Sequence, residues 1–136
     1  MDLVKAMEQA AKGMKAQGSR MRVISENMAN AETTGKTVNE NPYQRQVVTF
    51  RNELNRADGT REVEANDTTL DPTPFIMKYD PGHPAANAEG YVKMPNVNPM
   101  LEMMDMREAQ RSYEANLGVI EMSRSMLTKT IDLLRG

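Results

Sequence analysis

The sequence predicts an α+β protein: two long terminal α-helices form an antiparallel coiled-coil hairpin, with a small β-rich domain inserted between them. Apolar residues recur every three or four positions at both ends of the chain, whereas prolines and short β-type runs gather in the middle. The 136 residues suffice for one domain. We divide the chain into an N-terminal helix (1–34), a β-rich middle with loops (35–95) and a C-terminal helix (96–136).

The N-terminal segment carries one apolar stripe. Steps of four and three lead from Leu3 through Met7, Ala10, Met14, Gln17, Met21, Ile24, Met28 and Ala31. This spacing is typical of one face of a long helix. Asp2 is placed to cap its start, and the pattern ends at Thr33 and Thr34, with Gly35 as the expected left-handed stop.

The C-terminal segment repeats the pattern. Its stripe runs through Met103, Met106, Gln110, Tyr113, Leu117, Ile120, Arg124, Leu127, Ile131 and Leu134. Asn98 before Pro99 predicts a capped start, because proline in the first turn loses no hydrogen bond. A parallel row, Val119, Met122, Met126 and Leu133, widens the apolar face, so we expect more than one neighbouring helix.

The middle of the chain reads as a small antiparallel sheet. Its β-type runs are QVVTF, TREVEA, PFIMKY and GYVKM. Asp58-Gly59 is a hairpin-turn signal, and the turn-rich stretch from Tyr79 to Gly90 predicts an ordered surface loop.

The C-terminal helix is too long for a compact domain. About 36 residues at 1.5 Å each give ~54 Å, whereas a compact domain of this size has a diameter of roughly 35 to 40 Å. We therefore expect the apolar stripes to be buried against other molecules. Methionine is adaptable enough to contact several different partners, and Gln17 and Arg124 within the stripes are expected to fix the register by finding polar mates.

Composition and motifs argue against catalysis and nucleic-acid binding. The net charge is only −2, there is no cysteine, and His83 is the single histidine, which we interpret as an ordinary loop residue. We expect no cofactor and no metal. Glu102, Asp105 and Glu108 are attributed to the dipole at a helix start. Charges interrupt every apolar run at the N-terminus, so we expect neither a cleavable signal nor a lipid-spanning segment.

Three blocks of the sequence resemble one family. The stretch from Ser25 to Gly35 contains Asn-x-Ala-Asn-Ala-x-Thr, and the blocks Tyr79 to Pro99 and Arg111 to Leu134 follow in order. The chain resembles the bacterial flagellar rod, hook and filament axial proteins, and its second block is similar to proximal rod members. The matching motif residues are Asn27, Ala29, Asn30, Ala31, Thr33, Gly35, Pro95, Asn96 and Val97.

The resemblance implies a non-enzymatic subunit of the proximal rod of the flagellar basal body. Such a subunit assembles through its terminal helices, here 1–34 and 96–136 as inner-tube assembly segments, into a helical drive shaft that transmits torque. The implied partners are other copies of the chain, the B-, F- and G-type rod proteins, the E-type basal-body adapter and the flagellar type III export apparatus. The implied location is the periplasmic part of the rod, reached without cleavage of a signal peptide.

The family motif then has an expected role. Asn27, Asn30 and Thr33 would satisfy backbone groups at the helix terminus and between subunits, while Ala29 and Ala31 would let neighbouring helices approach closely. Replacing Asn27 and Asn30 by alanine should then change the melting temperature of the monomer little. The expected assembly interface comprises Leu3, Met7, Met14, Met21, Ile24, Met28, Tyr113, Leu117, Ile120, Arg124, Leu127, Ile131 and Leu134.

Two alternatives remain open at this point. The first is a coiled-coil adaptor or secretion chaperone that forms a small closed oligomer. The second is an enzyme that uses Asp71, Asp80 and Glu89, which would require these acids to cluster in a cleft.

Overall fold

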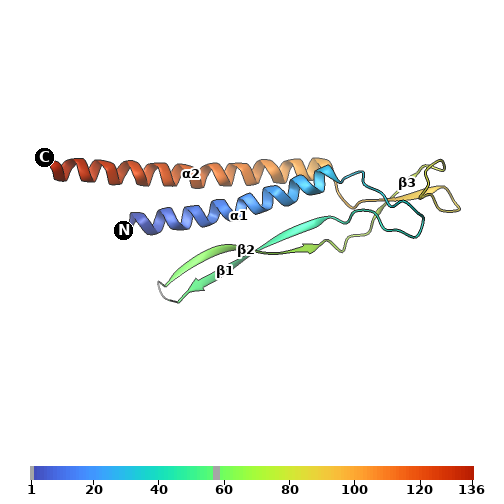
Figure 1. Cartoon of the computed structure of the whole chain (residues 1–136), viewed down its shortest axis with the longest axis horizontal. Coiled ribbons are helices and arrows are strands. Elements are labelled where there is room, and N and C mark those ends of the chain that lie inside the picture. The colour runs from blue at the N-terminus through green and yellow to red at the C-terminus, as the bar shows by residue number, and fades with distance from the viewer. Residues whose placement is uncertain (1, 57–58) are drawn as a thin grey trace.

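The computed structural model describes residues 2–56 and 59–136 and shows an elongated molecule dominated by two long helices (Figure 1). The predicted fold class and order of elements are confirmed. The helices are α1 (Leu3–Ala29) and α2 (Pro99–Arg135). The strands are β1 (Gln46–Asn55), β2 (Thr60–Leu70), β3 (Ile76–Tyr79) and β4 (Tyr91–Met94).

The two helices run antiparallel along one another, which confirms the predicted hairpin (Figure 1). Near its middle, α1 carries Gly13, and a Cβ built there would lie 2.8 Å from Nδ2 of Asn116. Glycine at this position therefore lets the Asn116 side chain sit against the α1 backbone. About two turns further on, Arg20 forms an ion pair of 3.3 Å with Glu108.

This register leaves the end of α2 without a partner helix. When the pairing of Gly13 with Asn116 is continued to the start of α1, Leu3 comes opposite Met126. The remaining turns of α2 extend beyond α1, as Figure 1 shows. At 37 residues, α2 is about 55 Å long.

Both predicted caps at the helix starts are confirmed. The Asp2 side chain accepts a hydrogen bond of 3.2 Å from the Val4 amide. The Asn98 side chain accepts one of 3.1 Å from the Met100 amide, and Pro99 occupies the first turn. These side chains satisfy amide groups that have no partner within the helix.

The predicted end of α1 is wrong. The helix ends at Ala29: beyond it the amides of Ala31 and Thr33 donate to carbonyls three residues back, at 3.3 and 3.1 Å, and Nδ2 of Asn30 donates to the Glu26 carbonyl at 2.8 Å. Gly35 is not in the left-handed region, unlike Gly59 in the described part of the chain. Its role is to allow a close approach, since a Cβ at Gly35 would lie 2.5 Å from the carbonyl oxygen of Glu40.

All four predicted strand segments are strands, but they form two separate two-stranded antiparallel sheets rather than one. β1 and β2 form a long hairpin with a bulge between Val48 and Phe50. Of the predicted hairpin turn, Asp58 lies outside the described residues, and Gly59 has φ of 66°. β3 and β4 form a second, shorter hairpin.

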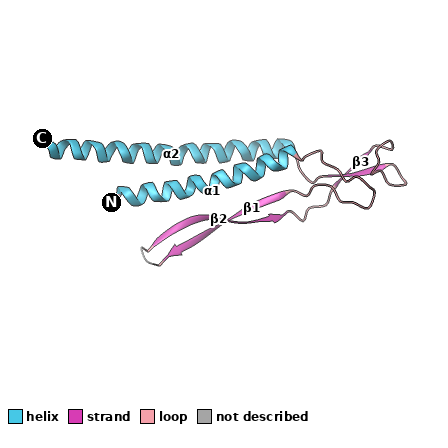
Figure 2. Ribbon diagram, in the orientation of Figure 1, coloured by secondary structure: helices cyan, strands magenta, loops and turns pink. Residues whose placement is uncertain are grey.

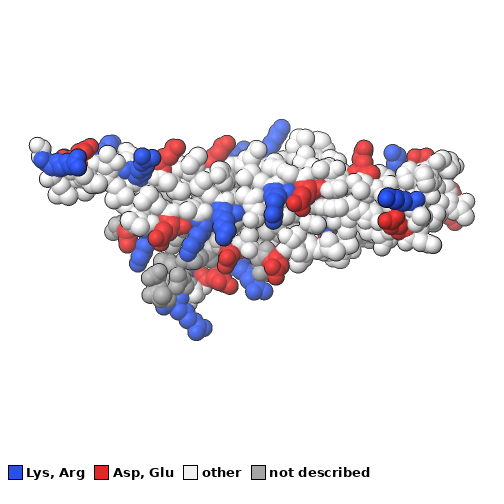
Figure 3. All heavy atoms as spheres, in the orientation of Figure 1, with Lys and Arg blue, Asp and Glu red and all other residues white. Residues whose placement is uncertain are grey.

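The elements form an open stack with a thin core (Figure 2). The β1–β2 hairpin packs along α1, and the β3–β4 hairpin lies beyond the point where α1 ends and α2 begins. Figure 3 shows basic and acidic side chains mixed over the visible face, so neither sign dominates it. Half of the buried apolar side chains are alanines: Ala10, Ala16, Val23, Ile24, Ala85, Val92, Val97 and Ala109.

We predict that Gly35→Ala destabilises the chain by about 1–3 kcal/mol, because the added methyl group would force the Glu40 carbonyl to move. The matched control is Gly18→Ala within α1, where no atom lies within 4 Å of the built Cβ. It should instead stabilise the helix by about 0.5–1 kcal/mol. Urea unfolding followed by circular dichroism measures both changes. Equal stability of the two variants would contradict the role assigned to Gly35.

Candidate functional site

Buried polar side chains gather where the two helices meet the strands. Asn27, near the end of α1, and Glu102, in the first turn of α2, are each only 1% exposed. Asn96, between β4 and α2, is 9% exposed. Because buried polar groups require hydrogen-bond partners, such a cluster has a defined geometry. We call it the polar junction, comprising Asn27, Tyr43, Arg45, Asp71, Asn96 and Glu102.

Arg45, just before β1, lies at the centre of the polar junction. Its Nε donates to Glu102, and its Nη1 lies 3.1 Å from Oδ2 of Asp71. Nη2 is 3.7 Å from Oδ2 of Asp105. Burial opposes the charge of Arg45, but the hydrogen bonds and charges of Glu102 and Asp71 outweigh it and raise the pKa of the guanidinium. A charged guanidinium therefore stays beside the buried side chain of Glu102.

Asn27 bonds to the chain entering β1. Its Nδ2 donates to the Gln46 carbonyl at 2.8 Å, and its Oδ1 accepts from the Gln46 amide at 2.9 Å. The same oxygen accepts from the Tyr43 hydroxyl at 2.8 Å. Burial first, and then the charges of Glu26 and Glu102, raise the pKa of Tyr43, so that its hydroxyl keeps the proton it donates.

Asn96 joins the chain leading into α2 to the same place. Its Oδ1 accepts from the Arg45 amide at 2.7 Å, and its Nδ2 donates to the carbonyls of Asp71 and Thr73 at 3.2 and 3.0 Å. The motif residues Pro95 and Val97 on either side are buried as well. The polar junction thus fixes how the helix pair, the β1–β2 hairpin and the chain after β4 are oriented.

The geometry does not favour an acid–base site. Asp80 and Glu89 are exposed, and hydrogen bonds from Thr73, followed by the charge of Arg45, lower the pKa of Asp71. Within residues 2–56 and 59–136, no three His, Cys, Asp or Glu side chains are placed to hold a metal ion. His83 is a hydrogen-bonding loop residue, as predicted: its Nε2 lies 3.2 Å from Oγ1 of Thr34, and its Nδ1 accepts from an amide of the same loop.

The motif residues behave partly as predicted. Asn30 satisfies a carbonyl at the end of α1, and Thr33 donates to the Asn30 side chain at 3.2 Å. Asn27 instead bonds to β1 within the chain, so it does not satisfy the helix terminus. Ala29 is exposed and Ala31 half-buried. Their role in close approach between subunits stays a prediction.

The interpretation of Glu102 is incomplete. Glu102 lies in the first turn of α2, where a helix dipole favours an acid, but it is also buried and paired with Arg45. Tyr43, Arg45 and Asp71 were also missed as members of the polar junction. Their sequence signals are weak because they lie in connecting segments and contact residues far away along the chain.

The predicted interface stripes lie partly between the helices and partly on the surface. On α1, Ile24 is buried and the other members, Leu3, Met7, Met14, Met21 and Met28, are half-buried. On α2, Tyr113, Ile120 and Leu127 are half-buried, whereas Leu117, Arg124, Ile131 and Leu134 are exposed. The fully buried residues of α2 are the small or polar Glu102, Ala109 and Ser123.

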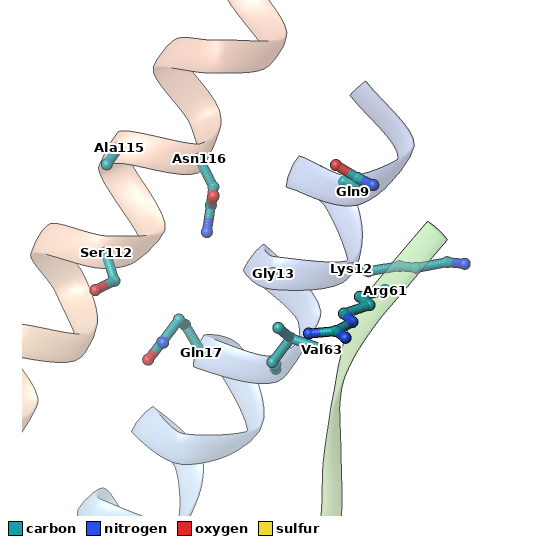
Figure 4. Close-up of a pocket in the computed structure, with 10 residues that line it drawn as sticks. Gln9, Lys12, Gly13, Gln17, Arg61, Val63, Ser112, Ala115 and Asn116 are labelled. Carbon is teal, nitrogen blue, oxygen red and sulfur yellow. The ribbon is translucent and has the colours of Figure 1, made fainter. Parts of the chain in front are cut away.

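A hollow of about 430 Å³ lies between α1, α2 and β2. Figure 4 shows the polar side chains of Asn116, Gln17 and Arg61 around it, together with the apolar Val63 and Ala115. Oε1 of Gln17 is buried and has no hydrogen-bond partner among the described residues. The expected polar mate of Gln17 is therefore not supplied within the described chain.

We predict that Asn27→Ala destabilises the monomer by about 1–3 kcal/mol, because the Gln46 amide and the Tyr43 hydroxyl lose their acceptor. This replaces the expectation of an unchanged melting temperature. The control Asn30→Ala loses an exposed bond and should cost no more than about 1 kcal/mol. Chemical unfolding of the two purified variants compares them. Equal losses would show that Asn27 does not hold the junction.

We also predict that stability depends on Asp71 at low pH. The folded-state pKa of Asp71 is lowered, so its contribution is present above the unfolded pKa of about 3.9 and is lost as the pH falls through the folded value. Asp71→Asn should therefore be less stable than the parent at pH 7, and the difference should shrink below about pH 4. Thermal melts across the pH range test this, with Asp67→Asn on the exposed surface of β2 as control. A difference that stays constant with pH would contradict it.

Comparison with known proteins covers nearly the whole chain. Residues 7–35 match the family model described as Flagella basal body rod protein, and residues 88–133 match Flagellar basal body rod FlgEFG protein C-terminal. These two segments contain most of both helices and the motif. No helix in the described part of the chain has the length and apolar character needed to cross a membrane.

Several curated relatives share one name, flagellar basal-body rod protein FlgC. The protein from Agrobacterium fabrum is 49% identical over 126 residues, which cover 93% of this chain and 91% of the relative. The one from Bacillus subtilis is 37% identical, over 91% and 93% of the two chains. The one from Escherichia coli O6:H1 is 38% identical over 98% of each chain. The chain therefore belongs to the FlgC family of flagellar basal-body rod proteins and is a structural subunit of that rod.

Proposed function

We propose that this subunit assembles through the outward faces of its terminal helices, with other copies of itself and with other rod proteins, into a helical shaft that transmits torque. The observation that supports this is the exposure of large apolar side chains along α2. They are Met100, Leu101, Met103, Met104, Leu117, Val119, Met122, Met126, Ile131, Leu133 and Leu134. Such a surface on one helix is typical of an interaction site, since burying each of these side chains yields about 1.5–3 kcal/mol.

The exposed residues form two rows on different sides of α2. Leu117 and Val119 are two residues apart, so their side chains point roughly 160° away from each other at 100° per residue. Leu117 is 39% exposed and Val119 is 44% exposed, although α1 packs against the same helix. Two separate apolar rows favour at least two neighbours, as a helical assembly requires.

In the proposed shaft, the polar junction would transmit torque from the helices to the strands. Torque applied to packed helices can reach the strands only through a connection that resists rotation. Arg45 holds the carboxylate of Asp71, just after β2, and that of Glu102 in α2. Asn96 accepts from the Arg45 amide, and Asn27 accepts from the amide of the next residue. Such a network of paired buried groups is rigid because each polar atom needs its partner.

The specific partners, the location, the export route and the lack of enzymatic activity rest on the family resemblance. We propose the B-, F- and G-type rod proteins and the E-type adapter as partners, and the periplasmic part of the rod as location. We also propose export through the flagellar type III apparatus without signal cleavage, and no enzymatic activity. A thin, alanine-rich core suits a chain that is unfolded for export, because little apolar area must be exposed again.

A closed adaptor or chaperone oligomer is the weaker candidate. A closed dimer uses one self-complementary patch on each subunit. It would cover one row of α2 and leave the other in water. The two rows therefore favour the open assembly over the adaptor.

We predict that Leu117→Asp and Val119→Asp, one in each row, leave the stability of the monomer within about 0.5 kcal/mol of the parent, since both sites are exposed. In the rod, each would bury a charge without a partner, and motility should be lost. Swimming in soft agar and isolation of basal bodies measure this. Ser125→Asp, at an exposed polar position, adds the same charge and should preserve swimming. Normal motility of both row variants would refute assembly through α2.

A further inference from the structure

We propose that four exposed methionines on one side of α2 form an oxidation site. Oxidants that donate an oxygen atom, such as hypochlorous acid, convert them to sulfoxides in the free subunit, and the oxidised subunit is then excluded from the rod. This inference rests on the proposed function, to which it adds chemical control over one of the two apolar rows. We call the four residues the methionine row: Met100, Met104, Met122 and Met126.

The methionine row lies along one side of the helix. Met100 and Met104 are four residues apart, as are Met122 and Met126, and residues with this spacing are neighbours on a helix surface. Met122 follows Met100 after about six turns of 3.6 residues. Both pairs therefore point to the same side of α2.

This side of α2 faces away from the rest of the subunit. The buried residues Glu102 and Ala109 mark the side that faces the polar junction and α1. At roughly 100° per residue, they point about 140–160° away from Met104. Val119 lies within roughly 60° of Met122, so the methionine row belongs to the apolar row that contains Val119.

Exposure distinguishes the methionine row from most other methionines. The exposed fractions of its members are 70, 65, 64 and 50% in chain order. The remaining exposed methionines among the described residues are Met103, at 43%, and Met77 in β3, at 49%. The other methionines of the helices are half-buried, namely Met7, Met14, Met21 and Met28 of α1 and Met106 of α2. Because a sulfur atom must be accessible to react, the methionine row should be oxidised first.

The composition of the chain directs such oxidants to methionine. The chain contains 13 methionines and no cysteine, so no thiol competes with the thioethers. In the net reaction, the sulfur gains one oxygen atom and loses two electrons, while hypochlorous acid gives up that oxygen atom and leaves as chloride and a proton. The product, methionine sulfoxide, is polar, whereas the thioether is apolar.

A sulfoxide in the methionine row leaves the subunit folded but blocks its contacts in the rod. The row points away from α1, so in the free subunit the added oxygen stays in water. In the proposed rod the same side is buried against another chain, where the oxygen would lose its hydrogen bonds to water inside an apolar contact. A subunit already in the rod is protected, since the oxidant cannot reach these sulfur atoms.

Mass spectrometry of the purified subunit tests the oxidation step. We would add hypochlorous acid in increasing amounts and measure sulfoxide at each methionine. The methionine row should react at least about fivefold faster than the four half-buried methionines of α1, because these are less accessible. Helix content measured by circular dichroism should stay unchanged while only the row is oxidised. Equal rates on both helices would overturn the proposal.

Isolated basal bodies supply the comparison for the assembled state. Under the same treatment, the methionine row in the rod should oxidise about tenfold more slowly than in the free subunit, because neighbouring chains cover it. The same rate in both states would overturn the proposal.

The variants Met104→Gln/Met122→Gln and Met104→Leu/Met122→Leu test the exclusion step. Glutamine is polar like the sulfoxide, whereas leucine is apolar, has nearly the volume of methionine and cannot be oxidised. The glutamine variant should keep the helix content of the parent but lose rod assembly and swimming in soft agar, and the leucine variant should keep all three. Met77→Gln makes the same change at an exposed site of β3 and should swim normally.

A glutamine variant that builds normal rods would contradict the proposal. A leucine variant that builds none would contradict it as well, because shape rather than polarity would then control assembly. The proposed function is judged separately. It still stands if Leu117→Asp blocks rod assembly, and it fails too if Leu117→Asp and Val119→Asp both assemble normally.

Discussion

The ion pair between Arg45 and Glu102 is the interaction on which the rest of the structure depends. It joins the chain before β1 to the first turn of α2, across 57 residues of sequence. Without the guanidinium, a carboxylate could not remain at 1% exposure in this place. The bonds of Asn27 and Asn96 to the neighbouring backbone rely on the same placement of Arg45, so one cation positions both helices relative to the strands.

The contact between the helices is built differently from the surface of α2. Within the hairpin, α2 buries Ala109 and Ser123 and places Asn116 against Gly13. Its large apolar side chains lie mostly on the outside. Small residues allow close approach and define a register, whereas the larger apolar area stays exposed on the subunit. The helix therefore gains only part of the hydrophobic stabilisation that its side chains could supply, and in the assembly that we propose other chains would supply the rest.

Local signals predicted the helices, their two N-caps and the four strand segments, because periodicity and capping depend on neighbouring residues. They failed where the cause is one specific contact rather than a repeating pattern. At the end of α1, Nδ2 of Asn30 donates to the Glu26 carbonyl, and Gly35 is required by the close carbonyl of Glu40, neither of which a glycine stop rule detects. The apolar stripes were found, but which of their members face α1 depends on Glu102, whose burial follows from a cation in a remote loop.

The long-range pairing of α2 with earlier segments sets an order of events. Arg20 can form its ion pair only when Glu108, 88 residues later, is present, and Asn27 can donate to Glu102 only when α2 is present. A chain that enters a compartment with its N-terminus first therefore has α1 and the β1–β2 hairpin in place before either can find its helical partner. Such distant pairings fold slowly. The helix hairpin and the polar junction therefore close only once the C-terminal segment is present.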